Sequence, residues 1–199
     1  MFDENKWIDY SGLINKTLKD YVSEVQLNPY NFLSERDVQC TLFMMLNSHK
    51  EINNLQKTLD GRKISPLHSE VSYFNDEGKL MFHVDLSIID PKTTDVYSKR
   101  KKMEIIFAKE YRAGLCYAAI EIKFNRRDSK NKILEKWKKD WAKLDNILTR
   151  NPLLTCYSIL HDKRNHFSKQ DEIIPYSKEY SKVKIIYTNF KGDALFLNF

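Results

Sequence analysis

Two stretches of the sequence, residues 81–89 and 115–124, alternate between apolar residues and residues of other kinds. Side chains alternate between the two faces of a β-strand, so this period predicts two strands with one wholly apolar face each. The apolar faces would be formed by Phe82, Val84, Leu86 and Ile88, and by Cys116, Ala118, Ile120, Ile122 and Phe124. The opposite faces carry Asp85 in the first strand and Glu121 and Lys123 in the second. The chain is thus expected to contain a sheet that buries one face and sets acidic groups on the other.

The remaining elements are expected around these strands in the order α-α-β-β-(insertion)-β-α-β-β. Helices are predicted at residues 5–26, 34–47 and 129–149, and strands at 67–74, 79–89, 115–124, 153–160 and 183–187. Ser34 suits the N-cap of the second helix, with Asp37 three residues later as in a capping box. This order predicts an α/β fold with a central mixed sheet flanked by helices. One domain over residues 1–199 is expected, with residues 1–30 as an N-terminal helical appendage and 91–114 as a basic insertion.

The composition excludes several classes of protein. No stretch approaches the roughly 20 apolar residues that span a bilayer, and the N-terminus has no signal-peptide pattern, so a cytoplasmic protein without a membrane partner is expected. The three cysteines, Cys40, Cys116 and Cys156, lie far apart without CxxC spacing, which argues against disulfides and zinc. No glycine-rich phosphate loop is present, so chemistry that depends on nucleoside triphosphates is not expected.

The positive charge of the chain is concentrated in one part of it. The net charge is +6, but residues 99–143 alone hold fifteen Lys and Arg against six Asp and Glu. One interpretation is a binding surface for a polyanion, through residues 99–102 and 126–143. The other is an ordinary solvated surface rich in lysine.

The two strand acids are the candidate chemical site. If the strands are neighbours, Asp85 and Glu121 lie about one strand spacing apart, roughly 4.8 Å between backbones. Two carboxylates that close repel each other unless a positive group lies between them, and Mg²⁺ meets that need with few protein ligands. Glu35 is a candidate third acid, because it shares a helix face with Val38 and Leu42. Acids also favour first helical turns because of the macrodipole, which is the alternative for Glu35.

The combination of a helix acid, a hairpin, a strand Asp and a strand Glu-x-Lys before a helix resembles the PD-(D/E)XK nuclease superfamily. The likeness covers residues 34–160 and rests on Glu35, Asp85 and Glu121-Ile122-Lys123. It implies a restriction-endonuclease-like α-β-β-β-α-β core and a Mg²⁺-dependent endonuclease (Mn²⁺ as substitute) that hydrolyses phosphodiester bonds, most readily those of DNA. Asp85, Glu121, the Ile122 carbonyl and Glu35 would hold the metal, and Lys123 would position or activate water. Val84 stands where the motif has Pro.

The sequence also allows other interpretations of what the chain does. The chain could be a catalytically silent nuclease-like subunit that binds nucleic acid or a protein partner, or an unrelated small α/β enzyme, for which no motif is visible. A homodimer is a further expectation, because a double-strand cut usually needs two active sites. Several residues have both a structural and a functional reading: Glu70, His83, Trp137, Trp141, Lys136, Lys139, Lys143 and the segment His161–His166. The tryptophans are expected in the core, and the lysines on the polar side of their helix.

Overall fold

The computed structural model describes residues 4–74, 80–94, 116–151, 154–167, 169 and 172–199. Its helices are α1 (Glu4–Leu27), α2 (Glu35–Asn47), α3 (Lys50–Asn53), α4 (Lys130–Arg150) and α5 (Ile174–Ser177), with 3-10 turns at Pro29–Asn31, Pro91–Thr93 and Lys178–Tyr180. Its strands are β1 (Gln56–Lys57), β2 (Lys63–Ile64), β3 (Leu67–Phe74), β4 (Leu80–Ile89), β5 (Cys116–Asn125), β6 (Thr155–Asp162), β7 (Val183–Asn189) and β8 (Ala194–Leu197). Most of the predicted basic insertion lies outside the described residues.

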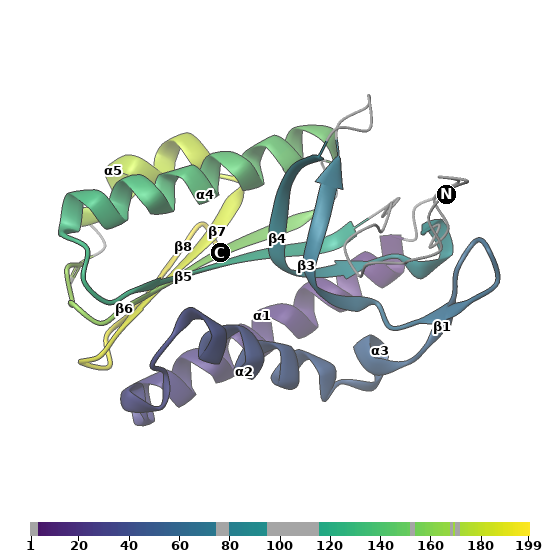
Figure 1. The fold of residues 1–199 in the computed structure, drawn as a ribbon, viewed down its shortest axis with the longest axis horizontal. Helices are drawn as coiled ribbons and strands as arrows, with labels where there is room; N and C mark the ends of the chain where they lie inside the picture. The colour runs from purple at the N-terminus through teal and green to yellow at the C-terminus, as the bar shows by residue number, and fades with distance from the viewer. Residues whose placement is uncertain (1–3, 75–79, 95–115, 152–153, 168, 170–171) are drawn as a thin grey trace.

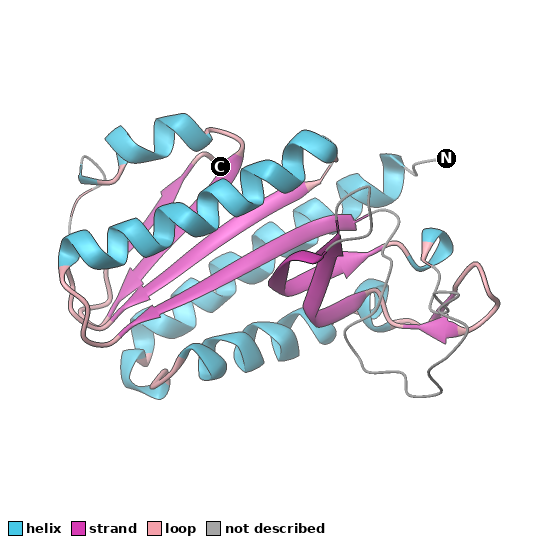
Figure 2. Cartoon of the chain, turned by 45° about the horizontal axis from the view of Figure 1, so that its top comes forward, coloured by secondary structure: helices cyan, strands magenta, loops and turns pink. Residues whose placement is uncertain are grey.

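One mixed sheet forms the centre of the molecule, with strands in the order β3-β4-β5-β6-β7-β8. Strands β5, β6 and β7 are parallel, whereas β3, β4 and β8 join antiparallel, and β1 pairs with β2 separately. Helices α1 and α2 cover one face of the sheet, and α4 and α5 cover the other (Figures 1 and 2). The predicted α/β class, a mixed sheet flanked by helices, is therefore confirmed.

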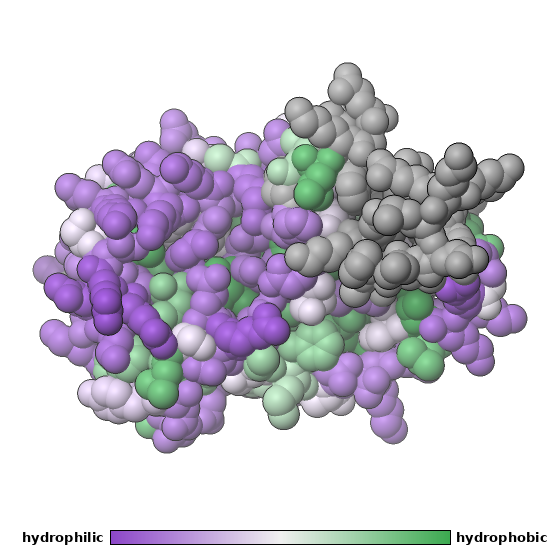
Figure 3. All heavy atoms as spheres, viewed as in Figure 1, coloured by the Kyte–Doolittle hydropathy of each residue, from purple (hydrophilic) through white to green (hydrophobic). Residues whose placement is uncertain are grey.

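Each face of the sheet has its own apolar core. On the α1/α2 side, Leu18 and Leu42 are fully buried against Ile120 and its neighbours. On the α4 side, Trp137 and Trp141 are fully buried as predicted, and Trp137 Nε1 donates to Ser158 Oγ at 2.8 Å. The outward face of α4 is hydrophilic (Figure 3), as an amphipathic helix requires. Both faces of the central strands are thus buried, which is typical of a sheet with parallel strands.

The predicted alternation of side chains between the two faces of the sheet is interrupted in β4 and at the start of β5. Val84 packs in the α4-side core, whereas Leu86 on the same strand packs in the α1/α2-side core, because β4 curls away from β5. At the start of β5, the register shifts between Ile88 and Ile89 and leaves Tyr117 as the extra residue of a bulge. This bulge places Cys116 in the α4-side core and Tyr117 in the other.

The N-terminus of α2 is fixed by the predicted cap. Ser34 has extended backbone angles, and its side chain accepts a hydrogen bond from Asp37 N at 3.2 Å. Asp37 Oδ2 in turn accepts from Leu33 N at 2.9 Å. These bonds satisfy amides at the end of the helix that carries Glu35 and Gln39.

Ser34→Ala is expected to lower the free energy of unfolding by about 1 kcal/mol, because a helix N–H loses its acceptor. For a chain of this length that corresponds to a fall of roughly 2–4 °C in the melting temperature. The measurement is thermal unfolding followed by circular dichroism. Ser34→Asp should restore stability, since Asp caps helices equally well; a destabilised Ser34→Asp would contradict the assignment of the cap.

None of the helices that the structure describes combines the length and the apolarity needed to cross a membrane.

Candidate active site

The candidate site lies where β4 separates from β5. The two strands pair from Ile89↔Cys116 to Leu86↔Ile120, whereas β5 and β6 remain paired as far as Asn125↔Asp162. Asp85 and Glu121 are the next residues after the last β4–β5 pair, one on each side of the fork. Figures 1 and 2 show the β3–β4 hairpin curling away from the plane of the other strands at this point. The fork therefore brings together the two acids that the sequence analysis selected.

Carboxylates replace β4 as acceptors along the opened edge of β5. Alternate residues of a strand turn their N–H groups to the same edge, so Ile122 and Phe124 follow Ile120 toward the side that β4 has left. Ile122 N donates to Asp85 Oδ2 at 2.7 Å, and Phe124 N donates to Glu35 Oε2 at 3.2 Å. Backbone amides of β5 thus hold two of the three predicted acids, Asp85 and Glu35, at the fork. Oδ1 of Asp85 accepts no hydrogen bond from the part of the chain that the structure describes.

Helix α4 supplies two further charged groups. Lys143 Nζ forms an ion pair with Glu121 Oε1 at 2.6 Å and donates to the His83 carbonyl at 2.6 Å, so it spans the fork. Asp140 Oδ2 forms an ion pair with Lys123 Nζ at 3.3 Å. Because the Glu121 and Asp140 side chains are only 4% and 14% exposed, solvent screens these pairs weakly.

Burial governs the acid–base properties of the site. Burial raises the pKa of Asp85 to about 6, helped by the charge of Glu35 and opposed by the Ile122 amide and the two lysines. Burial and then the charge of Asp85 raise the pKa of Glu121 to about 8, although Lys143 opposes the shift. Burial also lowers the pKa of Lys123, but the nearby acids outweigh it and the net pKa is raised. Burial and mutual repulsion therefore disfavour two negative charges at the fork, so both acids hold their protons to a higher pH than exposed acids do.

The donor atoms at the fork fit Mg²⁺ with a small protein ligand set. In the regions that the structure describes, no three His, Cys, Asp or Glu residues are grouped so that they could hold a metal ion together, and Glu35 accepts from Phe124 N. Mg²⁺ is commonly held by one or two carboxylates and keeps several waters. The Ile122 carbonyl is a further oxygen donor, because it faces the same strand edge as the Ile122 amide. Lys143 places a positive group against Glu121 in the absence of a metal.

Glu70 and His83, which each had a structural and a functional interpretation, both make hydrogen bonds within the fold. Gln39 Nε2 donates to Glu70 Oε1 at 3.2 Å and to the Asp85 carbonyl at 3.0 Å, so it ties β3 and β4 to α2. Glu70 lies beside the fork with a φ of 55°, a strained angle for a residue other than glycine. His83 Nδ1 is hydrogen-bonded to Ser72 Oγ at 2.9 Å across the hairpin.

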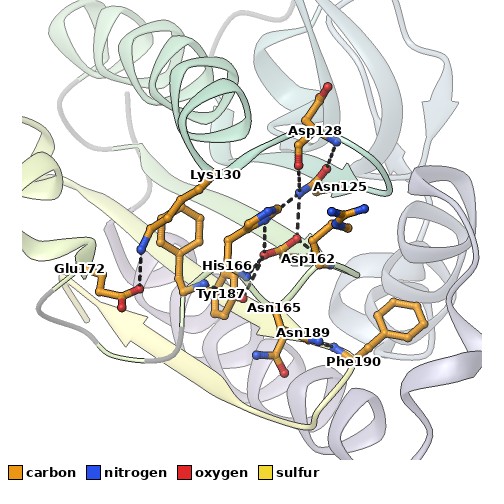
Figure 4. Close-up of polar contacts among 12 residues, drawn as sticks. Asn125, Asp128, Lys130, Asp162, Asn165, His166, Glu172, Tyr187, Asn189 and Phe190 are labelled. Carbon is orange, nitrogen blue, oxygen red and sulfur yellow. Dashed lines mark hydrogen bonds and ion pairs between the residues drawn. The ribbon is translucent and has the colours of Figure 1, made fainter.

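A second polar cluster braces the ends of β5, β6 and β7. Asp162 is fully buried and accepts hydrogen bonds from the Asn125 side chain at 2.8 Å, the His166 amide at 2.6 Å and the Tyr187 hydroxyl at 3.1 Å (Figure 4). The Arg164 amide also donates to Asp162 at 3.0 Å. A buried carboxylate with this many donors is stabilised as a structural acceptor. The first residues of the segment His161–His166 are therefore buried and connect the ends of the three strands.

Asp140 was missed by the sequence analysis, and Lys143 was assigned to the polar side of its helix. The prediction for Lys143 is wrong, because its side chain is only 20% exposed and reaches the fork. Asp140 lies three residues after Trp137 and four before Leu144, so an acid interrupts the buried stripe of α4. That interruption is the signal that could have identified it. Lys136 and Lys139 are exposed, as expected.

Comparison with protein-family models, curated proteins and solved structures finds no match for this chain.

Proposed function

We propose that this protein is a metal-dependent endonuclease that hydrolyses phosphodiester bonds of DNA. The observation that carries the proposal is the fork, where the half-buried Asp85 and the buried Glu121 face each other although burial raises the pKa of both. A group kept at such a cost to stability suggests a cation-binding role. Apart from the short α3, β1 and β2 between α2 and β3, the element order α2-β3-β4-β5-α4-β6 is also the order implied by the resemblance to PD-(D/E)XK nucleases.

The proposal gives each residue of the fork a role. Asp85, Glu121 and the Ile122 carbonyl would hold Mg²⁺, which would act as a Lewis acid on the scissile phosphate and lower the pKa of bound water. Lys123 keeps its ammonium charged beside Asp140 and stabilises negative charge that develops on the phosphate. Glu35 anchors the start of α2 to the opened edge of β5, through Phe124 N.

Lys143 has a role that depends on whether a metal is present. Without metal, its ammonium neutralises Glu121 and links α4 to the backbone of β4. If Glu121 held a divalent cation, the Lys143 ammonium would lose this partner and would be free to turn toward a bound substrate. A displaced cation in this position is suited to contact the substrate phosphate.

A catalytically silent nuclease-like subunit is the second candidate. It is favoured by one observation, the two ion pairs that neutralise Glu121 and Asp140 without any metal. Calorimetric titration with Mn²⁺ or Mg²⁺ separates the two proposals. Saturable binding supports the endonuclease, and no binding with or without DNA supports the silent subunit.

The direct test is cleavage of a substrate panel. The protein is incubated with linear, nicked, branched and single-stranded DNA and with RNA, in Mg²⁺, Mn²⁺ or EDTA, and the products are resolved on denaturing gels. We expect DNA cleavage in the presence of either metal and none in EDTA. Intact substrates in every condition would contradict the proposed activity, and cleavage of RNA alone would contradict the choice of DNA.

A further inference from the structure

A cavity of about 310 Å³ lies at the carboxyl ends of β5 and β6. It is lined by Leu33, Arg126, Arg127 and Lys163. Arg126 and Arg127 directly follow β5, Lys163 directly follows β6, and Lys163 N donates to the Asn125 carbonyl at 2.9 Å. Three cations from two neighbouring strand ends therefore meet around one hollow, at the edge of a parallel sheet where ligands commonly bind.

These cations differ from three lysines of α4, whose charge is balanced by carboxylates. Lys130 pairs with Glu172 at 3.0 Å, and Lys132 and Lys136 pair with Asp128 at 3.0 and 2.5 Å. In contrast, within the described ranges no carboxylate pairs with any of the three cavity cations. The cavity therefore gathers three cations whose charge no described carboxylate balances, and this charge is available to an anion.

The cavity is also held in shape without a ligand. Arg126 Nε donates to the Leu33 carbonyl at 2.8 Å, and its guanidinium lies over the Phe124 ring, 5.8 Å from the ring centre. Lys163 Nζ lies 5.3 Å from the centre of the Phe190 ring. The buried Asp162 cluster fixes the loops that carry these residues (Figure 4). Such preorganisation lowers the entropic cost of binding.

We propose that this cavity binds a phosphate group of the DNA strand on which the fork acts. This inference rests on the proposed function. Three cations without an acid select an anion, and the planar guanidinium groups suit phosphate oxygens. Arg126 follows Lys123 by three residues, roughly 10 Å along an extended strand, and Leu33 precedes Glu35 by two. A few nucleotides span that distance, so one strand can occupy the fork and the cavity together.

The test measures binding separately from cleavage. Fluorescein-labelled single-stranded and duplex DNA of about 20 nucleotides is titrated in EDTA, and fluorescence anisotropy is recorded at several salt concentrations. Arg127→Ala/Lys163→Ala is the test variant, because Arg126 also holds Leu33. We expect about tenfold weaker binding or more, and a decrease of roughly 2 in the slope of log affinity against log salt.

Lys132→Ala/Lys136→Ala is the matched control, because it removes the same charge from lysines that are already paired. We expect it to change affinity less than threefold. Equal losses in both variants would overturn the inference, because total charge alone would then explain binding. Thermal stabilisation of the wild type by inorganic phosphate, with unchanged DNA affinity of the test variant, would also overturn it, since the cavity would then take a free phosphate.

The outcome for the cavity is distinguishable from the outcome for the activity. A wild-type protein that cleaves nothing but loses DNA binding in the test variant alone contradicts the endonuclease and supports the cavity. A wild-type protein that cleaves DNA, with a test variant that binds as well as the control, contradicts the cavity and leaves the fork as the active site.

Discussion

Asp85→Asn is expected to lower metal-dependent cleavage by about 10³-fold, the upper end of the effect of removing one group that stabilises the charge of a transition state. The substitution keeps the shape of the side chain, and its amide oxygen can still accept from Ile122 N. It removes one of the two charges that would attract the metal, so saturable metal binding in calorimetry should be lost as well. Initial rates on the best substrate of the panel are the measurement.

Two variants make this prediction specific. Asp20→Asn, on the exposed side of α1, changes the net charge equally and should cleave like the wild type. Lys123→Ala should lose a similar factor in cleavage but keep metal binding, because Lys123 offers no oxygen ligand. Cleavage by Asp85→Asn at the wild-type rate would remove the fork from the mechanism, whatever the metal does.

The elements that could be predicted have local signals. Residues 67–74 were predicted as a strand and form β3 with the same bounds, and the cap at Ser34 begins α2 as expected. The stripe of α4 was predicted from helical spacing alone, and its tryptophans are buried. In each case the pattern of one short segment determines its structure, and packing only adds to it.

The short strands could not be predicted, because they carry no local signal of their own. β1 and β2 have two residues each, too few to show an alternating pattern. β8 has four residues and is placed by a turn at Gly192, whose φ of 81° favours glycine. These strands form because a partner strand is present, and a single segment of sequence does not reveal its partner.

The sequence predicts which charged residues form the candidate site, but not how they are arranged in space. Strand periodicity selects Asp85, Glu121 and Lys123, because each lies at a polar position of a buried strand. It does not reveal that the β4–β5 ladder ends at Leu86, which depends on the curl of the hairpin. It also does not reveal that Lys143 reaches Glu121, since that contact depends on how α4 packs across the sheet.

Glu121→Gln is expected to stabilise the metal-free protein at alkaline pH. The pKa of Glu121 is about 8 in the folded protein, above the ordinary value of 4.5, so the folded state holds this proton more tightly than the unfolded state does. The free energy of unfolding that Glu121 contributes is therefore largest below pH 4.5 and decreases progressively as the pH rises to about 8. Asp85 adds a smaller loss of the same sign between pH 3.8 and about 6. Gln keeps the shape and a polar oxygen near Lys143 but does not ionise.

The measurement is the melting temperature from pH 5 to 9 in EDTA, with Glu135→Gln on the exposed side of α4 as the charge-matched control. The loss in the wild type is on the order of a few kcal/mol, since each unit of pKa difference is worth about 1.4 kcal/mol. Wild type and control should melt at falling temperatures as the pH rises, and Glu121→Gln should fall less and melt roughly 5–10 °C higher at pH 8.5.

Metal should remove the advantage that Glu121→Gln has over the wild type in melting temperature. Saturating Mg²⁺ binds the ionised carboxylate, so it should raise the melting temperature of the wild type at pH 8.5 and leave Glu121→Gln unchanged. A Glu121→Gln variant that melts below the wild type in EDTA would mean that the ion pair with Lys143 stabilises the fold. Glu121 would then be a structural partner of α4, and the fork would have no need of a metal.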